Sequence, residues 1–238
     1  MKKKFLKSAA GILLTCFLHF SCFSLSNTKF QNEFNSMVSQ SKKINQYKLK
    51  VTQEFYSALR KKINYSYGTL LLEKPNKFRF EITKPRKELY VFNGKDFWKY
   101  IEEMNLAQHF NSNLPELGYI SILADLTKLT KYYTVSEWEN KLTTTQQINP
   151  KENSTSQILN TIPKYAKNSI YIQLIPKENS EQKVLYAVYD KSKKIITQLT
   201  IEHSSGNQSR FIFDTDAKSQ MTADTFNFKI PQGIHVSD

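Results

Sequence analysis

Cysteine and glycine are both scarce in this sequence. Its 238 residues contain two cysteines and six glycines. Both cysteines, Cys16 and Cys22, fall within a stretch at the start of the chain that has the pattern of an export signal. The rest of the chain has no cysteine, so its fold must depend on a core of its own rather than on disulfides. Aromatic residues make up 13% of the sequence, which excludes a disordered or collagen-like chain.

Residues 1–26 have the composition of a cleavable signal peptide. Four lysines within the first seven residues precede an apolar stretch over 9–23, and Ser24-Leu25-Ser26 then places small residues where signal peptidase cuts. We predict cleavage after Ser26, with a cut after Ser24 as the second choice. The alternative is a retained membrane anchor, which the shortness of the apolar stretch disfavours. The residues before Cys16 and Cys22 match a lipoprotein signal poorly.

The remaining chain, residues 27–238, is long enough for one sizeable domain of 212 residues. The signal holds four of the 34 basic residues and none of the 21 acidic ones, so the exported chain carries a formal charge of +9. Such a charge suits anionic lipid headgroups or nucleic acid. Because the lysines are spread along the chain, a solvated surface in a lysine-rich composition is the favoured interpretation. No second apolar stretch is long enough to span a membrane.

Local motifs of catalysis and metal binding are also missing. After cleavage the histidines are His109, His203 and His235, which lie far apart in the sequence. There is no Gly-x-Ser-x-Gly, no phosphate-binding glycine loop and no Cys/His cluster. Asp214 and Asp216 form a D-x-D pair that is more typical of a turn than of a metal site. We therefore expect no enzyme activity, no cofactor and no metal, although a spatial triad needs no local signature.

Strands are predicted along most of the chain. In the stretch LLLEKPNKFRFEITKP (70–85), Phe78, Phe80 and Ile82 alternate with charged or polar residues, the period of a half-buried strand. Asn93-Gly94 between two apolar runs predicts a hairpin. Further strands are expected at 49–55, 65–72, 89–92, 97–100, 132–135, 170–174, 184–189, 195–203, 210–213 and 226–228.

Two amphipathic helices interrupt this pattern. Residues 28–44 place Phe30, Phe34, Met37 and Val38 on one stripe, and residues 115–129 place leucines and Ile120 at three- and four-residue steps. The polar segment 139–168 is expected to be a long loop or insertion. Short turns between strands predict an antiparallel meander. The expected fold is mainly β, a strongly curved and unclosed antiparallel β-barrel with short helices across its mouth.

The chain also resembles a known family in three stretches, GTLLLEKPNKFRFEI (68–82), LYVFNGKDFWKY (89–100) and FNFKIPQGIHVSD (226–238). These resemble, in order, the motifs of the periplasmic outer-membrane lipoprotein carrier protein family, LolA. A further stretch, YIQLIPKE (171–178), is similar to the strand that opens the second half of the family's sheet. Two departures are Lys74, where the family typically has Arg, and the long 139–168 segment.

The resemblance implies a function and partners. A member of this family is a periplasmic chaperone that carries lipid-modified proteins from an inner-membrane export complex to an outer-membrane acceptor, with no nucleic acid involved, and is expected to be a monomer. The alternatives are a lipid-sensing regulatory binder on the same scaffold and a secreted lipid hydrolase. The implied ligand is a set of acyl chains held in an apolar cavity. Strand parity and helix spacing predict its lining as Phe55, Leu70, Leu72, Phe78, Phe80, Phe92, Trp98, Leu117, Ile120 and Leu123.

Lys74 is predicted to act as a latch. It shares one side of its strand with Leu70 and Leu72, so it points towards the cavity near the rim. An ammonium there needs acceptors, and the last turn of a helix offers unpaired carbonyls. We expect Lys74 to bond to carbonyls of the 115–129 lid when the cavity is empty. The alternative is a lysine that extends to solvent.

Overall fold

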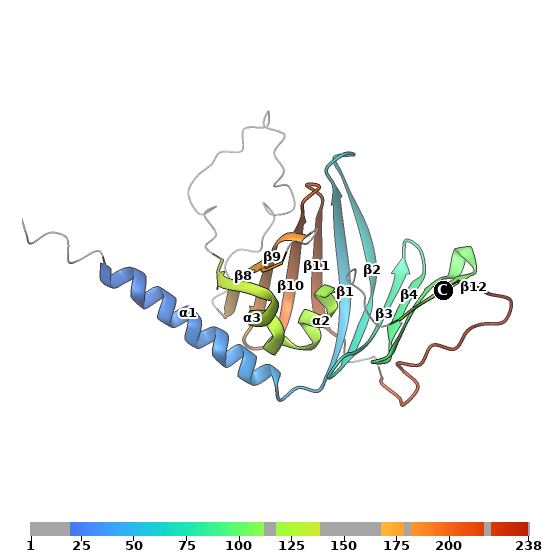
Figure 1. Ribbon diagram of the computed structural model, residues 1–238, viewed down its shortest axis with the longest axis horizontal. Coiled ribbons are helices and arrows are strands. Elements are labelled where there is room, and N and C mark those ends of the chain that lie inside the picture. Colours follow the sequence, from blue (N-terminus) through green and yellow to red (C-terminus); the bar gives the residue numbers. More distant parts are fainter. Residues whose placement is uncertain (1–19, 112–117, 139–167, 179–181, 217–219, 238) are drawn as a thin grey trace, which may run out of the picture.

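A computed structural model describes residues 20–111, 118–138, 168–178, 182–216 and 220–237 (Figure 1). The predicted loop at 139–168 and lid residue Leu117 therefore lie outside the described residues, except for Asn168. So do the first 19 residues, and the predicted cleavage after Ser26 stays a prediction.

The described strands form a single twelve-stranded sheet. Its first half is a meander of six strands, β1 (Gln46–Ser57), β2 (Lys62–Glu73), β3 (Lys77–Lys84), β4 (Glu88–Phe92), β5 (Asp96–Ile101) and β6 (Leu106–Asn111). Its second half contains β7 (Tyr133–Glu137), β8 (Ser169–Pro176), β9 (Gln182–Asp190), β10 (Ile195–His203) and β11 (Gln208–Thr215). The chain ends in the short strand β12 (His235–Ser237).

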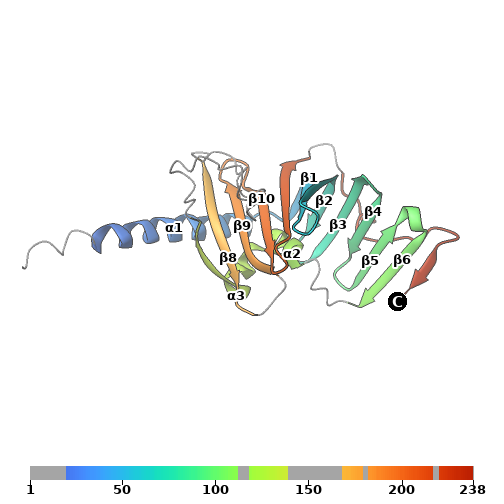
Figure 2. The same cartoon turned by 90° about the horizontal axis from the view of Figure 1, so that it is seen from above.

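The two halves join where β1 pairs with β11, in the order β12-β6-β5-β4-β3-β2-β1-β11-β10-β9-β8-β7. All pairs are antiparallel except β12 with β6. In the described part β7 and β12 are the two edges and do not pair, so the sheet curves without closing (Figure 2). The predicted unclosed antiparallel fold is confirmed, although β6 and β12 were not among the predicted strands.

The first predicted helix is confirmed as part of α1 (Phe20–Ser41). Phe30, Phe34 and Met37 are 6%, 3% and 1% exposed, so the predicted stripe is the buried face of the helix. No glycine follows the end of the helix, and the chain leaves through a turn in which Ile44 N donates to Ser41 O. None of the helices in the described part is long and apolar enough to cross a membrane.

The second predicted helix is wrong as a single element. The structure divides its described part into α2 (Gly118–Ala124), the 3-10 turn η2 (Leu126–Lys128) and α3 (Leu129–Tyr132). The break occurs at Asp125, whose carboxylate accepts hydrogen bonds from Thr127 N at 3.1 Å and Thr127 Oγ1 at 2.6 Å. A side chain that bonds to nearby backbone N–H groups competes with the helix, which explains why the apolar periodicity continues while the helix does not.

The predicted hairpin at Asn93-Gly94 is confirmed between β4 and β5. Gly94 has φ +99°, a conformation that favours glycine. Asn93 Oδ1 accepts from Lys95 N and Asp96 N, so the asparagine side chain closes the turn. The predicted strand at 226–228 is wrong, because these residues are irregular. Phe228 contacts Trp98 and Tyr100 on the outer side of the sheet, and the buried Phe226 lies beneath the ammonium of Lys77.

Gly68 provides a test of how closely β2 and β3 approach. A Cβ at this position would lie 2.1 Å from the carbonyl oxygen of Glu81, at a shift in strand register. Because neither backbone can move without breaking the ladder, Gly68→Ala is expected to lower the free energy of unfolding by about 2–3 kcal/mol. Urea denaturation measures this.

Gly233→Ala is the matched control for that experiment. Gly233 has φ +77° but no atom within 4 Å of the methyl group that the change would add, so only the backbone conformation opposes it. The expected loss is about 1 kcal/mol. Equal losses in the two variants would contradict the close approach of β2 to β3.

Candidate functional site: the apolar inner face and its lid

The side chains on one side of the sheet, here called the inner face, are apolar across both halves. Two rows of register partners cross the first half of the sheet, one over four strands and the other over five. One row joins Leu49, Leu70, Phe80 and Tyr90, and the other joins Tyr47, Leu72, Phe78, Phe92 and Phe97. In the second half, Phe211, Leu199, Ala187 and Ile172 form a corresponding row. Alternation with period two gives the sheet one continuous apolar side.

Aromatic rings dominate the part of the inner face on β3 to β6. The ring centroid of Phe78 lies 5.9 Å from those of both Phe92 and Phe97, and the centroid of Phe97 lies 5.5 Å from that of Phe110. Such separations are typical of favourable tilted contacts between rings. Aromatic rings have large apolar surfaces and few rotatable bonds. The part of the inner face on β3 to β6 is therefore rigid and favourable for contact with hydrocarbon.

The lid, defined as α2, η2 and α3, packs on the inner face over β1, β10 and β11. Its buried side chains are Ile120, Ile122, Leu123, Ala124, Leu126 and Leu129, which join one core cluster with residues of both sheet halves. Tyr119 stacks on Phe211 with centroids 4.6 Å apart. A cavity of about 10 Å³ lies between the lid and the sheet, lined by Tyr47, Leu49, Leu123, Leu126, Lys194, Ile195 and Ile196. This is about the room of one water molecule, so in this conformation the lid itself fills the space.

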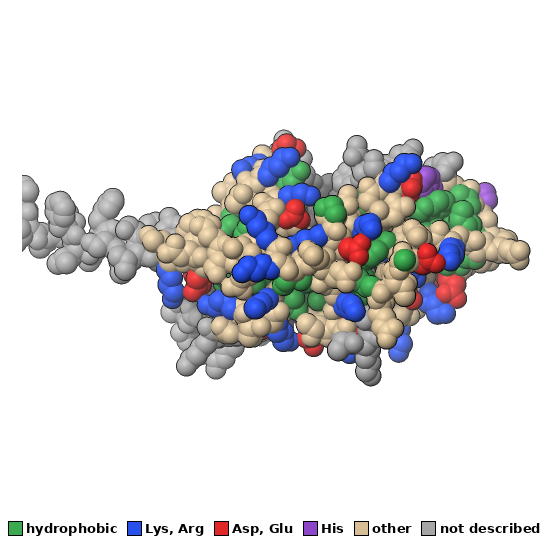
Figure 3. Space-filling view, turned by 90° about the horizontal axis from the view of Figure 1, so that it is seen from below, with side chains coloured by type: hydrophobic (Ala, Val, Ile, Leu, Met, Phe, Trp, Pro, Cys, Tyr) green, Lys and Arg blue, Asp and Glu red, His purple; other side chains and the backbone are tan. Residues whose placement is uncertain are grey.

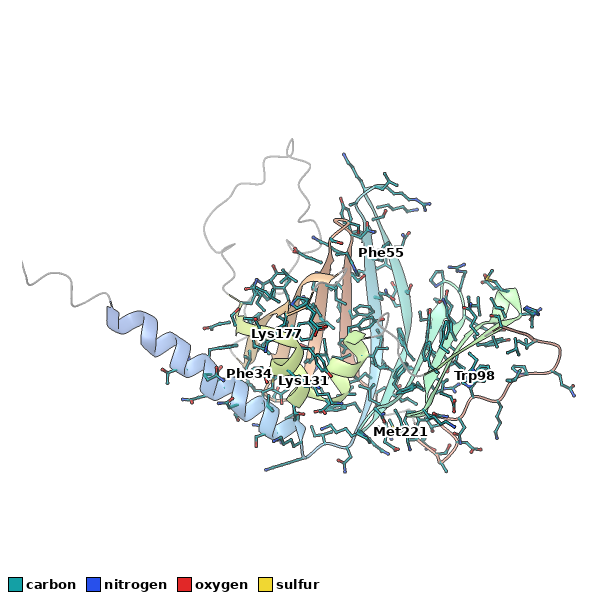
Figure 4. The ribbon with its side chains drawn as sticks, viewed as in Figure 1. Phe34, Phe55, Trp98, Lys131, Lys177 and Met221 are labelled. Atoms are coloured by element: carbon teal, nitrogen blue, oxygen red, sulfur yellow. The ribbon has the colours of Figure 1, made fainter. Side chains whose placement is uncertain are left out.

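Lys177 holds the end of the lid. Its backbone N–H donates to Tyr132 O at 3.0 Å, and its ammonium donates to Thr130 O at 2.6 Å. Both carbonyls belong to α3, and the last carbonyls of a helix have no helical N–H groups to donate to them. Lys131, whose ammonium lies 5.0 Å from the ring of Tyr132, is on the same segment (Figure 4). The lid is therefore tied to β8 by polar bonds at its exposed edge and by apolar contacts beneath.

Two phenols lie in the floor beneath the lid. Burial raises the pKa of Tyr47 to about 12, with a further contribution from Tyr189. The hydroxyl of Tyr189 is buried without a hydrogen-bond partner in the described part of the chain, and burial also raises its pKa. A buried hydroxyl without a partner is unfavourable, so this position favours a ligand that offers an acceptor.

Lys74 lies at the rim, at the end of β2, where α1 and the lid meet. Its ammonium donates to the backbone carbonyl of Ser41, the last residue of α1. Burial lowers the pKa of Lys74, while the charge of Asp125 on the lid raises it. The predicted use of a helix-end carbonyl therefore holds, but the acceptor belongs to α1 and not to the 115–129 segment. The lid acts on Lys74 through the negative charge of the Asp125 carboxylate.

A family model of the outer membrane lipoprotein carrier protein LolA matches residues 42–163, just over half of the chain. The chain belongs to the LolA family. Among curated relatives, an outer-membrane lipoprotein carrier protein of Coxiella burnetii (strain RSA 331 / Henzerling II) is 25% identical over 217 residues, with 90% of this chain and 92% of that protein covered. The protein of the same name from Aeromonas salmonicida (strain A449) is 23% identical over 192 residues, covering 79% and 80%.

Solved structures show only distant likeness to this LolA-family chain. A LolA superfamily protein from Nitrosomonas europaea superposes with a TM-score of 0.43 at 11% identity, covering 82% of this chain and 97% of that one. An uncharacterized conserved protein from Thermus thermophilus reaches 0.49 at 10% identity, covering 87% and 98%. Membership of the family is shown by the family model that matches residues 42–163, and not by these superpositions.

Most of the residues that strand parity and helix spacing predicted for the lining belong to the inner face or the lid. Leu70, Leu72, Phe78 and Phe80 are buried in the inner-face cluster, and the half-buried Phe92 packs against it. Ile120 and Leu123 belong to the same cluster from the lid. Phe55 shares the parity of Leu49 and Val51 and lies half-buried towards the upper end of β1 (Figure 4). That these residues bind acyl chains stays a prediction.

The prediction that Trp98 lines the inner face is wrong, because Trp98 points to the outer face of the sheet. It neighbours the buried Phe97 in β5, and neighbours in a strand point to opposite faces. Trp98 stacks on His109 at 4.4 Å and contacts Phe228 at 5.2 Å, so it packs under the C-terminal segment on the outer face (Figure 4). Counting parity from the Asn93-Gly94 turn would have identified Phe97, which is 2% exposed, in its place.

The outer face has its own hollow. Between the C-terminal segment and β3 to β5 lies an open groove of about 300 Å³, lined by Arg79, Leu89, Tyr100, Asp224, Asn227, Phe228, Lys229 and Pro231. It holds more space than the cavity beneath the lid, but charged side chains border it and it is open to solvent. Its lining therefore suits hydrocarbon less well than the inner face does.

The histidines and Asp214, which could in principle serve catalysis or metal binding, form pairwise polar contacts. Asp214 pairs with Lys193 at 2.8 Å, and His109 lies with its Nε2 3.3 Å from Asp96 Oδ1. His203 Nε2 lies 3.2 Å from Ser209 Oγ. Within the described ranges, no group of three or more His, Cys, Asp or Glu residues is arranged to hold a metal ion.

Substitutions of Asp125 test how much its carboxylate stabilises the closed lid. Burial raises its pKa, but hydrogen bonds from Thr127 and the charges of Lys128 and Lys74 outweigh burial, so the net shift is downward from 3.8. The carboxylate is therefore favoured by folding, and its contribution is present above pH 3.8 and lost as pH falls through the lowered value. Asp125→Ala is expected to cost about 1 kcal/mol at neutral pH, as loss of a cap does.

Asp125→Asn is the matched variant, since it keeps an acceptor for Thr127 N and removes the charge. It should cost less than Asp125→Ala at neutral pH, and its difference from wild type should shrink below pH 3.8. Urea denaturation at the two pH values measures both. A difference that grows with acidification would contradict the role of the carboxylate.

Proposed function

We propose that the protein is a periplasmic chaperone that carries lipoproteins from the inner to the outer membrane, with their acyl chains held between the inner face and the lid. The carrier role follows from the family, and the continuous apolar inner face beneath a lid of short elements is the observation that favours acyl chains as the ligand. Its partners are expected to be an inner-membrane lipoprotein export complex and an outer-membrane acceptor.

The physical need for such a container is large. Each buried CH₂ of an acyl chain contributes roughly 0.8 kcal/mol, so one 16-carbon chain costs on the order of 12 kcal/mol to hold in water. An apolar face that is already covered by its own lid can accept such a chain by exchange. The lid side chains Ile120, Leu123 and Leu126 leave the inner face, and the chain takes their place. Apolar area then stays covered before, during and after loading.

A lid of three short elements suits this exchange. Helices this short are not stable on their own, so the lid depends on its contacts with the sheet and is expected to open as a unit. Lys74 joins α1 to β2 at the rim and places its charge near Asp125, so opening of the lid separates opposite charges. The hydroxyl of Tyr189, which has no partner among the described residues, offers a donor to an ester or amide carbonyl at the head of an acyl chain.

The second candidate is a lipid-sensing regulatory binder on the same scaffold. It would take up acyl chains in the same place but would not release them to a membrane. Uptake alone therefore does not separate the two functions, whereas transfer does. Purification from the envelope followed by mass spectrometry of bound molecules identifies the cargo, and a transfer assay with that cargo and outer-membrane vesicles decides between carrier and sensor.

Hydrogen exchange tests where the chains bind. On loading with a triacylated lipopeptide, the amides of α2, η2 and α3 should lose protection, while those at the centre of the sheet in β1, β2 and β10 keep theirs. Protection that changes only around the outer-face groove, near Tyr100 and Phe228, would contradict the proposed site. The two regions are far enough apart in sequence for peptide-level data to separate them.

Lys74→Leu tests the latch in the transfer assay. The change removes the bond to Ser41 and adds an apolar side chain at the rim, so loading should persist while transfer to acceptor membranes slows severalfold. Lys77→Leu is the matched control, because Lys77 lies three residues away and pairs with the surface carboxylate of Glu73. If Lys74→Leu unloads as fast as wild type, or if Lys77→Leu slows transfer equally, Lys74 is no latch.

A further inference from the structure

The connection between β1 and β2 projects from the sheet. The two strands pair as far as Ser57 with Lys62, whereas β3 follows β2 only as far as Tyr67; on the other side, β11 follows β1 as far as Tyr56. Figure 1 shows this hairpin rising beyond the neighbouring β10–β11 and β3–β4 connections. Residues 58–62, here called the β1–β2 tip, are therefore the most projecting part of this strand pair.

Leu59 stands at the apex of the tip. It is 92% exposed, the highest value among the large apolar side chains of the described residues, and the next highest is 62% for Met104. The turn that presents it is held by a hydrogen bond from Ala58 N to Asn207 Oδ1 at 3.0 Å and by one from Arg60 N to Ser57 Oγ at 3.4 Å. Single exposed leucines are common, so exposure alone does not define a site.

Three consecutive cations follow Leu59. Arg60, Lys61 and Lys62 are all exposed, and the sequence has no acidic residue between Glu54 and Glu73. In the described part of the chain no salt bridge involves any of the three. The lysines at the opposite end of the molecule differ, since Lys191 pairs with Glu33 and Lys193 with Asp214. On that end, cationic side chains lie scattered with acidic ones among them (Figure 3).

Lys61 has a backbone conformation that is unfavourable for a residue with a side chain. Its φ of +50° lies in the left-handed region that favours glycine or asparagine in a hairpin turn. Glycine there would fit the turn better but would remove one of the three charges.

We propose that the β1–β2 tip docks on the surface of an anionic lipid bilayer. Leu59 enters the boundary between headgroups and acyl chains, and Arg60, Lys61 and Lys62 contact lipid phosphates around it. An apolar residue flanked by cations matches that boundary, where apolar burial and attraction to anionic lipids add. A bilayer is favoured over an acidic protein because a stable protein interface buries about 800 Å² on each partner, more than a five-residue projection offers.

Docking through the tip leaves the rim of the lid free. The tip is at the start of β2 and Lys74 follows its end, so a strand of twelve residues, roughly 40 Å long, separates them. A docked molecule would thus hold the Lys74–Ser41 contact away from the bilayer. The inference does not rest on the proposed acyl-chain site, because it concerns the empty protein and a different end of the sheet.

Vesicle flotation with the protein free of cargo tests the proposal. Wild type should float with vesicles of phosphatidylcholine mixed with phosphatidylglycerol, bind vesicles of phosphatidylcholine alone weakly, and dissociate as salt is raised. Leu59→Asp should weaken binding about tenfold or more. Lys61→Gly should weaken it about fivefold while leaving the melting temperature unchanged or higher, since it removes one charge and relaxes the turn.

Two control variants separate the tip from the general surface. Met104→Asp changes the next most exposed apolar residue, which follows Glu102 and Glu103 in another turn, and Lys95→Gln removes an exposed cation from the β4–β5 turn. Both should bind vesicles as wild type does. Wild type that floats with neither kind of vesicle, Leu59→Asp that floats normally, or controls that lose binding equally would each overturn the proposal.

Discussion

Everything in this molecule depends on β1, which pairs with β2 on one side and with β11 on the other. Chain segments more than 150 residues apart thus become neighbours, and their alternating side chains point to the same faces. The seam is fixed by Glu54 and Arg210, which are register partners on the outer face, both buried and joined by a salt bridge. A buried pair of this kind is costly to break, so it opposes any slip of one half against the other.

Because the register is fixed, the inner face is apolar from β3 through β1 to β8, and such a face must be covered. Different segments cover the two halves of the outer face. In the first half the C-terminal segment covers it with Phe226 and Phe228, and in the second half Trp138 packs on Tyr171, Val188 and Tyr186. Those covers are aromatic and irregular. The inner face instead receives three short elements and the end of α1, a cover with a defined edge at Lys74 and another at Lys177.

The two proposals assign the two ends of β2 to different tasks. The end near Lys74 carries the contact that joins α1, the sheet and the charge of the lid, and it is suited to opening. The end at residues 58–62 lies away from the lid, and its exposed leucine and three cations suit a surface rather than a chain held inside. A carrier of lipid-bearing cargo has use for both, since its ligand starts and finishes in a bilayer.

The sequence by itself determined the alternation of the strands, the stripe of α1, the turn at Asn93-Gly94 and the family, because these depend on neighbours within a few residues or on motifs in order. It placed most of the inner-face residues correctly for the same reason. The prediction failed at Trp98, where two aromatic residues are adjacent and the alternation within the strand alone does not decide which one faces inward. It failed at Asp125, whose side chain ends a helix that the apolar pattern continues.

Only the tertiary structure decided which carbonyl Lys74 meets, that 226–228 cover the outer face without forming a strand, and that β12 returns to β6. Each of these joins residues remote in the chain, and the same short sequence would satisfy its local preferences in several places. Their position is set by which buried donor, apolar surface or strand edge remains uncovered once the sheet has formed, and a property of the assembled sheet cannot be found in any single stretch of the sequence.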